Sequence, residues 1–196
     1  MKRLIVAISG ASGMIYATRL IRWLIQNGQS VDFLISPPGR KVFELEIGKA
    51  PRDQKGWRKF FADRKGWLKY HEPDDFNSAL ASGSANRHGM IIIPCSMGMI
   101  GRIAAGISST LIERAADVTL KEGRPLVLVF REAPLSLIHL ENLAKLARAG
   151  AIILPAAPGF YRKPKKIEEL VDSLIGRTLK QIGIKNNLEK EWRNGG

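Results

Sequence analysis

The chain has 196 residues, of which 45% are hydrophobic and 25% charged, a composition typical of a globular protein with a sizeable core. Its single cysteine, Cys95, excludes an internal disulfide and a multi-cysteine metal site. His71, His88 and His139 lie too far apart to show metal-ligand spacing, so no metal is expected. The 31 Lys and Arg against 18 Asp and Glu give a net charge of +13, which favours anionic partners such as nucleic acid, a membrane surface or a phosphorylated small molecule.

Short apolar runs alternate with segments of helical period along the chain, which predicts an α/β domain built on a parallel sheet with helices on both faces. The predicted strands are Leu4–Ile8, Val31–Ile35, Met90–Ile93, Leu126–Phe130 and Ala151–Leu154. The predicted helices are Ser12–Asn27, one that follows the capping box Thr110–Glu113 and runs to about Leu120, Ser136–Ala149, and one from Pro164 to about Ile182. We expect a single domain over residues 1–185 and a C-terminal tail over residues 186–196.

Residues 49–69 form the most basic part of the chain, with eight Lys or Arg against two Asp. The segment also contains Trp57, Phe60, Phe61 and Trp67, and basic residues interleaved with aromatic ones are used by proteins that bind single-stranded nucleic acid. The alternative is an amphipathic excursion whose aromatic side chains pack on the body of the protein, and we favour this alternative. We expect residues 49–89 to form an extended arm with loop character.

The N-terminal apolar run stops at Ser9 and Gly10, which makes it too short for a secretory signal. No apolar stretch approaches the roughly 20 residues that a membrane span requires. We therefore expect a soluble cytoplasmic protein without a membrane partner.

Every predicted strand runs into a loop of small, hydroxylated, charged, glycine or proline residues. In a parallel sheet these loops share one edge, where ligands bind. The loops are Ser9–Gly13, Ser36–Gly39, Pro94–Gly98, Arg131–Pro134 and Pro155–Tyr161. The first places backbone N–H groups at a helix N-terminus, which suits a phosphate, although Gly10 and Gly13 lack the dinucleotide-binding spacing.

Charged residues add to this edge. Arg114 and Lys121 lie seven residues apart, on one face of a predicted helix, and Arg131 and Glu132 follow a buried strand directly. Together they predict a phosphate pocket with at least three cations and one candidate general acid or base. Cys95 is expected to be a small buried hydrophobe.

Four runs of the sequence form a recognisable combination: IIIPCSMG at 91–98, LIERAADV at 111–118, LVLVFREAPL at 126–135 and PGFY at 158–161. Together they resemble the UbiX family of flavin prenyltransferases, and the likeness extends from about residue 3 to residue 184. The resemblance implies a flavodoxin-like, Rossmann-type fold in three layers, usually assembled as a dodecamer, and a metal-independent reaction. The family joins the dimethylallyl group of dimethylallyl monophosphate to N5 and C6 of reduced FMN. The product, prenylated FMN, is the cofactor of UbiD-type decarboxylases.

The resemblance also implies roles for individual residues. Glu132 would relay a proton to the leaving phosphate with the help of Ser12, and Glu46 would lie near the flavin. Met99 stands where the family commonly has threonine. The implied FMN-binding residues are Gly10, Ala11, Ser12, Ser36, Ser96, Met97, Gly98, Met99 and Arg131, and the implied residues around the prenyl phosphate are Arg114, Lys121, Arg131, Tyr161, Arg177 and Trp192.

Two other functions remain open. The related cysteine decarboxylases share the fold and bind FMN, but they use a histidine base near the flavin, and no histidine lies in the first predicted helix here. A basic nucleic-acid-binding module would explain the charge, but no nucleic-acid-binding fold is recognised in the sequence. We expect no specific nucleic acid, and weak, salt-dependent binding at most.

Overall fold

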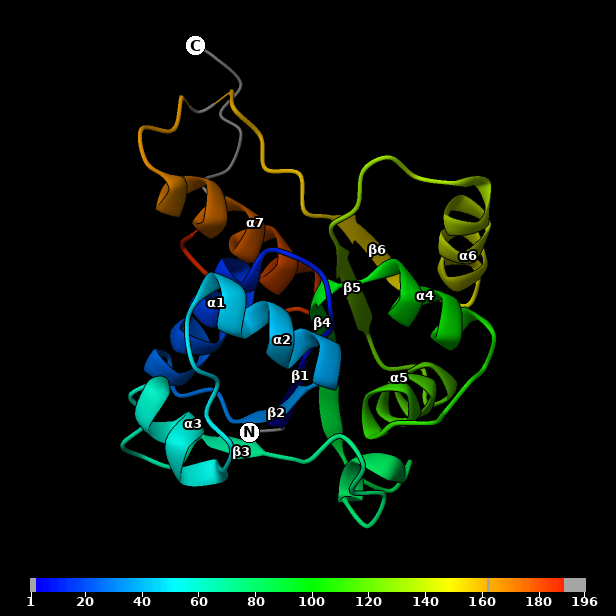
Figure 1. The fold of residues 1–196 in the computed structure, drawn as a ribbon, viewed down its shortest axis with the longest axis horizontal. Helices are drawn as coiled ribbons and strands as arrows, with labels where there is room; N and C mark the ends of the chain where they lie inside the picture. The colour runs from blue at the N-terminus through cyan, green and yellow to red at the C-terminus, as the bar shows by residue number, and fades with distance from the viewer. Residues whose placement is uncertain (1–2, 162, 189–196) are drawn as a thin grey trace.

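The computed structural model describes residues 3–161 and 163–188, which form one parallel six-stranded sheet between two layers of helices (Figure 1). The strand order is β3-β2-β1-β4-β5-β6. The strands are β1 (Arg3–Ile8), β2 (Val31–Ile35), β3 (Leu68–Tyr70), β4 (Arg87–Cys95), β5 (Leu126–Phe130) and β6 (Ile152–Pro155). The helices are α1 (Met14–Gln26), α2 (Pro37–Glu46), α3 (Gln54–Phe60), the short 3-10 helix η1 (Ala79–Ala81), α4 (Met97–Ala104), α5 (Leu111–Lys121), α6 (Leu137–Arg148) and α7 (Ile167–Gln181). The predicted parallel α/β architecture is confirmed.

Both faces of the sheet are buried, which explains why the strands are apolar at nearly every position. Along β1, Val6 and Ile8 contribute to the core under α1, α2, α3 and α7, while Ile5 and Ala7 contribute to the core under α4, α5 and α6. In Figure 1 the first group of helices lies on the left of the view and the second group on the right. Because successive side chains of a strand point to opposite faces, a strand covered on both sides shows no polar alternation.

Two helices that the sequence analysis did not predict begin directly after strands, and a serine caps each of them. Ser36 Oγ accepts from Gly39 N at 3.0 Å at the start of α2, and Ser96 Oγ accepts from Met99 N at 3.3 Å at the start of α4. A serine before a short helix is a recognisable N-cap signal. The predicted capping box of Thr110 and Glu113 is confirmed at the start of α5. By contrast, α7 begins at Ile167, three residues after Pro164, so the predicted first-turn role of this proline is wrong.

Much of residues 49–89 is loop, as predicted, but the segment packs on the body of the protein and is not an extended arm. The segment contributes α3, the edge strand β3 and η1, and its aromatic side chains lie in the core. Trp57 is fully buried, with its ring centroid 4.8 Å from Phe33 and 5.9 Å from Phe61. The favoured interpretation, aromatic rings packed on the body, is therefore confirmed, and the buried rings of Trp57 and Phe61 cannot stack on nucleic-acid bases.

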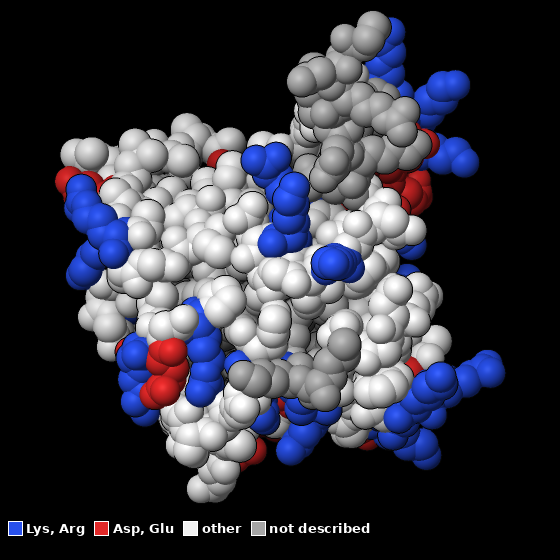
Figure 2. Space-filling model, turned by 180° about the vertical axis from the view of Figure 1, so that it is seen from behind, with Lys and Arg blue, Asp and Glu red and all other residues white. Residues whose placement is uncertain are grey.

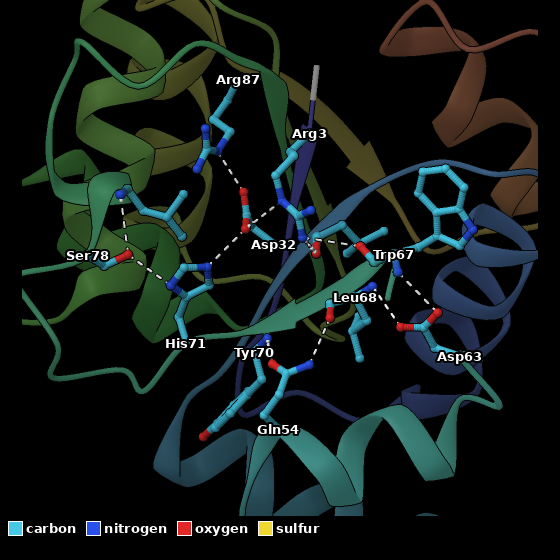
Figure 3. A network of polar contacts seen from close by, with 12 residues as sticks. Arg3, Asp32, Gln54, Asp63, Trp67, Leu68, Tyr70, His71, Ser78 and Arg87 are labelled. Carbon is cyan, nitrogen blue, oxygen red and sulfur yellow. Dashed lines mark hydrogen bonds and ion pairs between the residues drawn. The ribbon is translucent and has the colours of Figure 1, made fainter. Parts of the chain in front are cut away.

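A buried polar network holds the starting ends of three strands together (Figure 3). The fully buried carboxylate of Asp32 on β2 accepts from Arg3 Nε on β1 at 2.9 Å and lies 2.6 Å from Arg87 Nε on β4. His71, after β3, lies 2.9 Å from the same carboxylate through Nε2, and its Nδ1 lies 2.9 Å from Ser78 Oγ. This network occupies the opposite edge of the sheet from the strand-end loops and ties the segment after β3 to the sheet.

Candidate active site

The loops after β1, β2 and β4 contact one another at the carboxyl edge of the sheet. The hydroxyl of Ser9 accepts from Ser96 N at 2.7 Å and donates to Pro94 O at 3.1 Å, so it joins the first loop to the third. A Cβ at Gly10 would lie 2.7 Å from Pro38 Cβ, so only glycine lets the first loop approach the start of α2 this closely. Ser9 was not singled out from the sequence, because nothing in its local pattern shows that it bridges two loops.

The start of α4 offers backbone donors, whereas the start of α2 does not. In α2, Pro37 and Pro38 have no N–H, Gly39 N donates to Ser36 Oγ, and Arg40 N donates to Ser36 O. In α4, the N–H groups of Met97 and Gly98 have no partner within the described part of the chain. A helix N-terminus with unpaired N–H groups attracts an anion or a carbonyl oxygen.

These donors fit the chemistry of FMN, which carries a phosphate and carbonyl oxygens. The exposed Ser12 follows β1 and the exposed Arg131 follows β5, two strands on either side of β4, so both residues belong to loops on the same edge of the sheet. Arg131 has no ion-pair partner among the described residues, so its charge is available to an anion. The side chain of Met99 is buried in the core under α4, and its N–H donates to Ser96 Oγ, so neither group faces a ligand at this edge.

Glu46 occupies the N-terminus of α1. Its carboxylate accepts from Gly13 N at 3.1 and 3.2 Å and from Met14 N at 2.8 Å. The helix has no side-chain cap of its own, since Gly13 is the N-cap residue, and the last residue of α2 supplies the missing acceptor. The first loop is thus held from outside by a carboxylate, and the phosphate site expected at this helix start is already filled by an anionic side chain. A glutamate 33 residues from the helix it caps leaves no local sequence signal.

Arg131 and Glu132 follow β5, and Phe160 and Tyr161 follow β6, the next strand. Ala156 N donates to Phe130 O at 2.8 Å, which ties the two loops together at their origin. Glu132 is exposed, and its carboxylate accepts from Ala133 N at 3.1 Å. Phe160 is 69% exposed and Tyr161 54% exposed, so the loop after β6 presents apolar surface, and the loop after the neighbouring strand β5 carries an acid and a cation.

The remaining predicted phosphate-binding residues do not lie at this edge in a single chain. Lys121 is the last residue of α5, which runs back toward the starting end of β5. Arg114 on the same helix donates to Ala81 O at 3.0 Å, in the segment that leads into β4. Arg177 lies on the half of α7 that approaches the start of β4, where His88 Nε2 contacts Ile182 O at 2.6 Å. Trp192 lies outside the described residues.

Cys95 is fully buried, and burial raises the pKa of its thiol well above the ordinary value. A thiol held neutral in the core is not a nucleophile, as the sequence analysis expected. Among the described residues, no group of three or more His, Cys, Asp or Glu side chains is arranged to hold a metal ion.

Comparison with known proteins identifies the family. A family model described as Flavoprotein matches residues 1–179. A flavin prenyltransferase UbiX from Halalkalibacterium halodurans is 46% identical over 188 residues, which cover 95% of this chain and 91% of the relative. The chain belongs to the UbiX family of flavin prenyltransferases.

Solved structures of UbiX proteins share the fold. AnUbiX in complex with FMN and dimethylallyl pyrophosphate matches with a TM-score of 0.88 at 33% identity, covering 100% of this chain and 99% of that one. A dodecameric FMN-dependent UbiX-like decarboxylase from Escherichia coli O157:H7 matches with a TM-score of 0.86 at 36% identity, covering 98% and 100%. The family and the flavodoxin-like fold expected from the resemblance are therefore confirmed. In the described part of this UbiX chain, no helix is long and apolar enough to span a membrane.

Proposed function

We propose that this UbiX chain transfers the dimethylallyl group of dimethylallyl monophosphate to N5 and C6 of reduced FMN. The observation that carries the proposal is the strand-end edge itself. Unpaired N–H groups of Met97 and Gly98, the hydroxyl of Ser12 and the guanidinium of Arg131 gather there beside the carboxyl group of Glu132. The AnUbiX complex with FMN and a dimethylallyl donor supports both substrates.

Binding and chemistry divide between these residues. FMN, when bound and reduced, supplies the two nucleophilic positions. The Ser12 hydroxyl of the first loop and the N–H groups of Met97 and Gly98 in the third loop would hold it by its phosphate and ring oxygens. Arg131 stabilises the phosphate of the prenyl donor as the bond between carbon and oxygen breaks. Glu132, one residue further along, supplies a proton to the departing phosphate, with Ser12 assisting. The exposed apolar surface at Phe160 and Tyr161 helps to exclude water from the allylic cation.

We further propose that the working enzyme is a homo-oligomer, with a dodecamer as the expected size. Large apolar side chains of α6 are exposed in the single chain, including Leu137 at 70% and Ile138 at 68%, and such surface is typical of an interface. An oligomer also gives Arg114, Lys121 and Arg177 a route to the prenyl phosphate, because these residues would reach the pocket of another copy. The dodecameric state of the Escherichia coli relative supports this proposal.

The product, prenylated FMN, is proposed to pass to a UbiD-type decarboxylase in the cytoplasm. No metal has a part in the proposed step, since Arg and Lys side chains neutralise a monophosphate directly.

The decisive experiment is mass spectrometry of the flavin after anaerobic incubation with reduced FMN and dimethylallyl monophosphate. The expected result is a flavin heavier by one five-carbon unit, formed only when both substrates are present. Unmodified FMN would contradict the proposal and favour the alternative, an FMN-dependent decarboxylase. A parallel incubation with dimethylallyl diphosphate tests the donor, and we expect the monophosphate to react faster.

A further inference from the structure

Residues 81–85, which lead from the end of η1 toward β4, are fastened along α5 by two arginines. Near the start of the helix, Arg114 Nε donates to Ala81 O at 3.0 Å. Just beyond its end, Arg124 donates to Gly83 O at 2.8 Å and to Ala85 O at 2.6 Å. Lys121 lies two turns after Arg114 on the same helix face. The segment therefore runs along the face that carries both basic residues assigned above to the prenyl phosphate.

Glu122 fills the space that Gly83 leaves open. A Cβ at Gly83 would lie 2.2 Å from Glu122 Oε1, so the carboxylate rests directly against the glycine. From this place, Oε1 lies 3.8 Å from Lys121 Nζ, and Oε2 lies 3.9 Å from Arg124 Nη2. The carboxylate is thus held between the backbone of residue 83 on one side and two cations on the other.

Glycine is needed at position 83 for the room that it leaves to Glu122 and not for an unusual backbone conformation. Gly83 is absent from the glycines with positive φ, so its backbone suits any residue. The group that a Cβ would meet is the end of a flexible side chain, which can move aside without disturbing the fold. The glycine therefore matters for where the carboxylate of Glu122 lies.

We propose that Glu122 is a positioning residue for Lys121 and that Gly83 provides the room for it. This inference rests on the proposed role of Lys121 in binding the prenyl phosphate. Lysine carries a compact charge on a flexible stem, and the Lys121 side chain is half exposed. Among the residues that the structure describes, Glu122 is the ion-pair partner of its ammonium group. A carboxylate fixed beside it limits the ammonium to one side of the helix end.

Gly83→Ala in the full-length enzyme tests this, because it displaces the carboxylate while keeping every charge. We expect the KM for dimethylallyl monophosphate to rise about fivefold, the upper range for an exposed ion pair, with kcat and Tm unchanged. Ser84→Ala is the matched control in the same segment, since the Ser84 hydroxyl contacts Ser82 Oγ at 2.9 Å and not Glu122. The control should leave KM unchanged.

The Glu122→Ala background separates positioning from a general disturbance of the segment. In this background a Cβ at residue 83 meets no carboxylate, so Gly83→Ala should have no further effect on KM. An equal rise in KM in both backgrounds, or no rise in either, would overturn the inference.

Lys121→Ala distinguishes failure of the inference from failure of the proposed function. If Lys121→Ala raises KM and Gly83→Ala does not, Lys121 binds phosphate without the help of Glu122, and only the inference falls. If Lys121→Ala leaves KM unchanged, the phosphate-binding role of Lys121 is wrong, and the inference falls with it.

Discussion

The buried carboxylate of Asp32 offers the sharpest test of how the fold is held together. Asp32→Asn keeps the shape of the side chain but removes the charge that faces Arg3 and Arg87. The new amide nitrogen would face the guanidinium of Arg87, 2.6 Å from the present oxygen, or Arg3 if the amide is reversed, and two donors would then oppose each other. His71 keeps an acceptor only in one of these orientations.

The expected loss of folding free energy in Asp32→Asn follows from the burial of the Asp32 carboxylate. The Asp32 side chain is 0% exposed, while those of Arg3 and Arg87 are 26% and 17% exposed. Removing one partner of a buried ion pair costs about 3–5 kcal/mol because the remaining charge lacks compensation. Partial exposure of both arginines lets water compensate in part, so we expect about 3 kcal/mol, a large share of the roughly 5–15 kcal/mol that stabilises a typical domain.

Urea denaturation at fixed protein concentration measures this loss, and Asp172→Asn is its control. Asp172 pairs with Arg19 at 2.6 Å, but both side chains are partly exposed, so this substitution should cost less than about 1 kcal/mol. Equal losses in the two variants would refute the argument that burial of the network decides its contribution.

The pH dependence of the free energy of unfolding gives a second measure of what Asp32 contributes. Burial raises the pKa of Asp32, but the hydrogen bond from His71 and the charges of Arg3 and Arg87 outweigh burial and hold the pKa below its ordinary value of 3.8. A depressed pKa stabilises the fold above the unfolded-state value, and the contribution disappears as pH falls through the folded-state value. The difference between wild type and Asp32→Asn should therefore be constant from about pH 7 to 5 and shrink below about pH 4.

Four further predictions concern function. Glu132→Gln should retain FMN, followed by fluorescence titration, and lose about 10²–10⁴-fold in turnover, because proton transfer is removed and flavin contacts are not; loss of FMN would show that the residue is misassigned. Lys121→Ala should raise the KM for dimethylallyl monophosphate by roughly tenfold or more through loss of a charged hydrogen bond, and wild-type kinetics would contradict the phosphate pocket. Gly10→Ala should weaken FMN binding and cost about 1–3 kcal/mol in urea, because Pro38 cannot yield. Gly101→Ala, where a Cβ would lie 3.6 Å from the nearest atom, should do neither. DNA affinity should be weak and fall steeply with salt, and tight retention at high salt would argue for a nucleic-acid function.

The sequence predicted the centre of the sheet well, because central strands are specified by their own composition. Val31–Ile35 and Leu126–Phe130 were predicted with the observed bounds, since each is an apolar run enclosed on both faces. The edge strand β3 was missed because it has three residues, one of them the exposed Lys69, and depends on tertiary support. Gln54 supplies that support: its side-chain amide donates to Leu68 O at 2.8 Å and accepts from Tyr70 N.

The candidate site shows the same contrast between residues that the local sequence locates and residues whose place depends on tertiary packing. Residues that belong to a loop directly after a strand, such as Ser36 and Ser96, could be located from the sequence because parallel strands deliver their ends to one edge. Glu46 was placed near the flavin by resemblance alone, and its contact with the start of α1 depends on how α2 packs. Arg114 and Lys121 were grouped with the pocket from helical spacing. Spacing shows that they share a face but not which pocket that face adjoins.

The distribution of charged side chains between core and surface also bears on function. Three acidic side chains, those of Asp32, Asp63 and Glu113, are buried among arginine and backbone donors, so they do not screen the surface. Asp63, for example, accepts from three backbone N–H groups next to the exposed lysines of the basic segment. On the face shown in Figure 2, Lys and Arg form separate clusters with uncharged surface between them. On this face, scattered clusters do not follow a nucleic-acid backbone, whereas cations at individual sites suit small phosphorylated substrates.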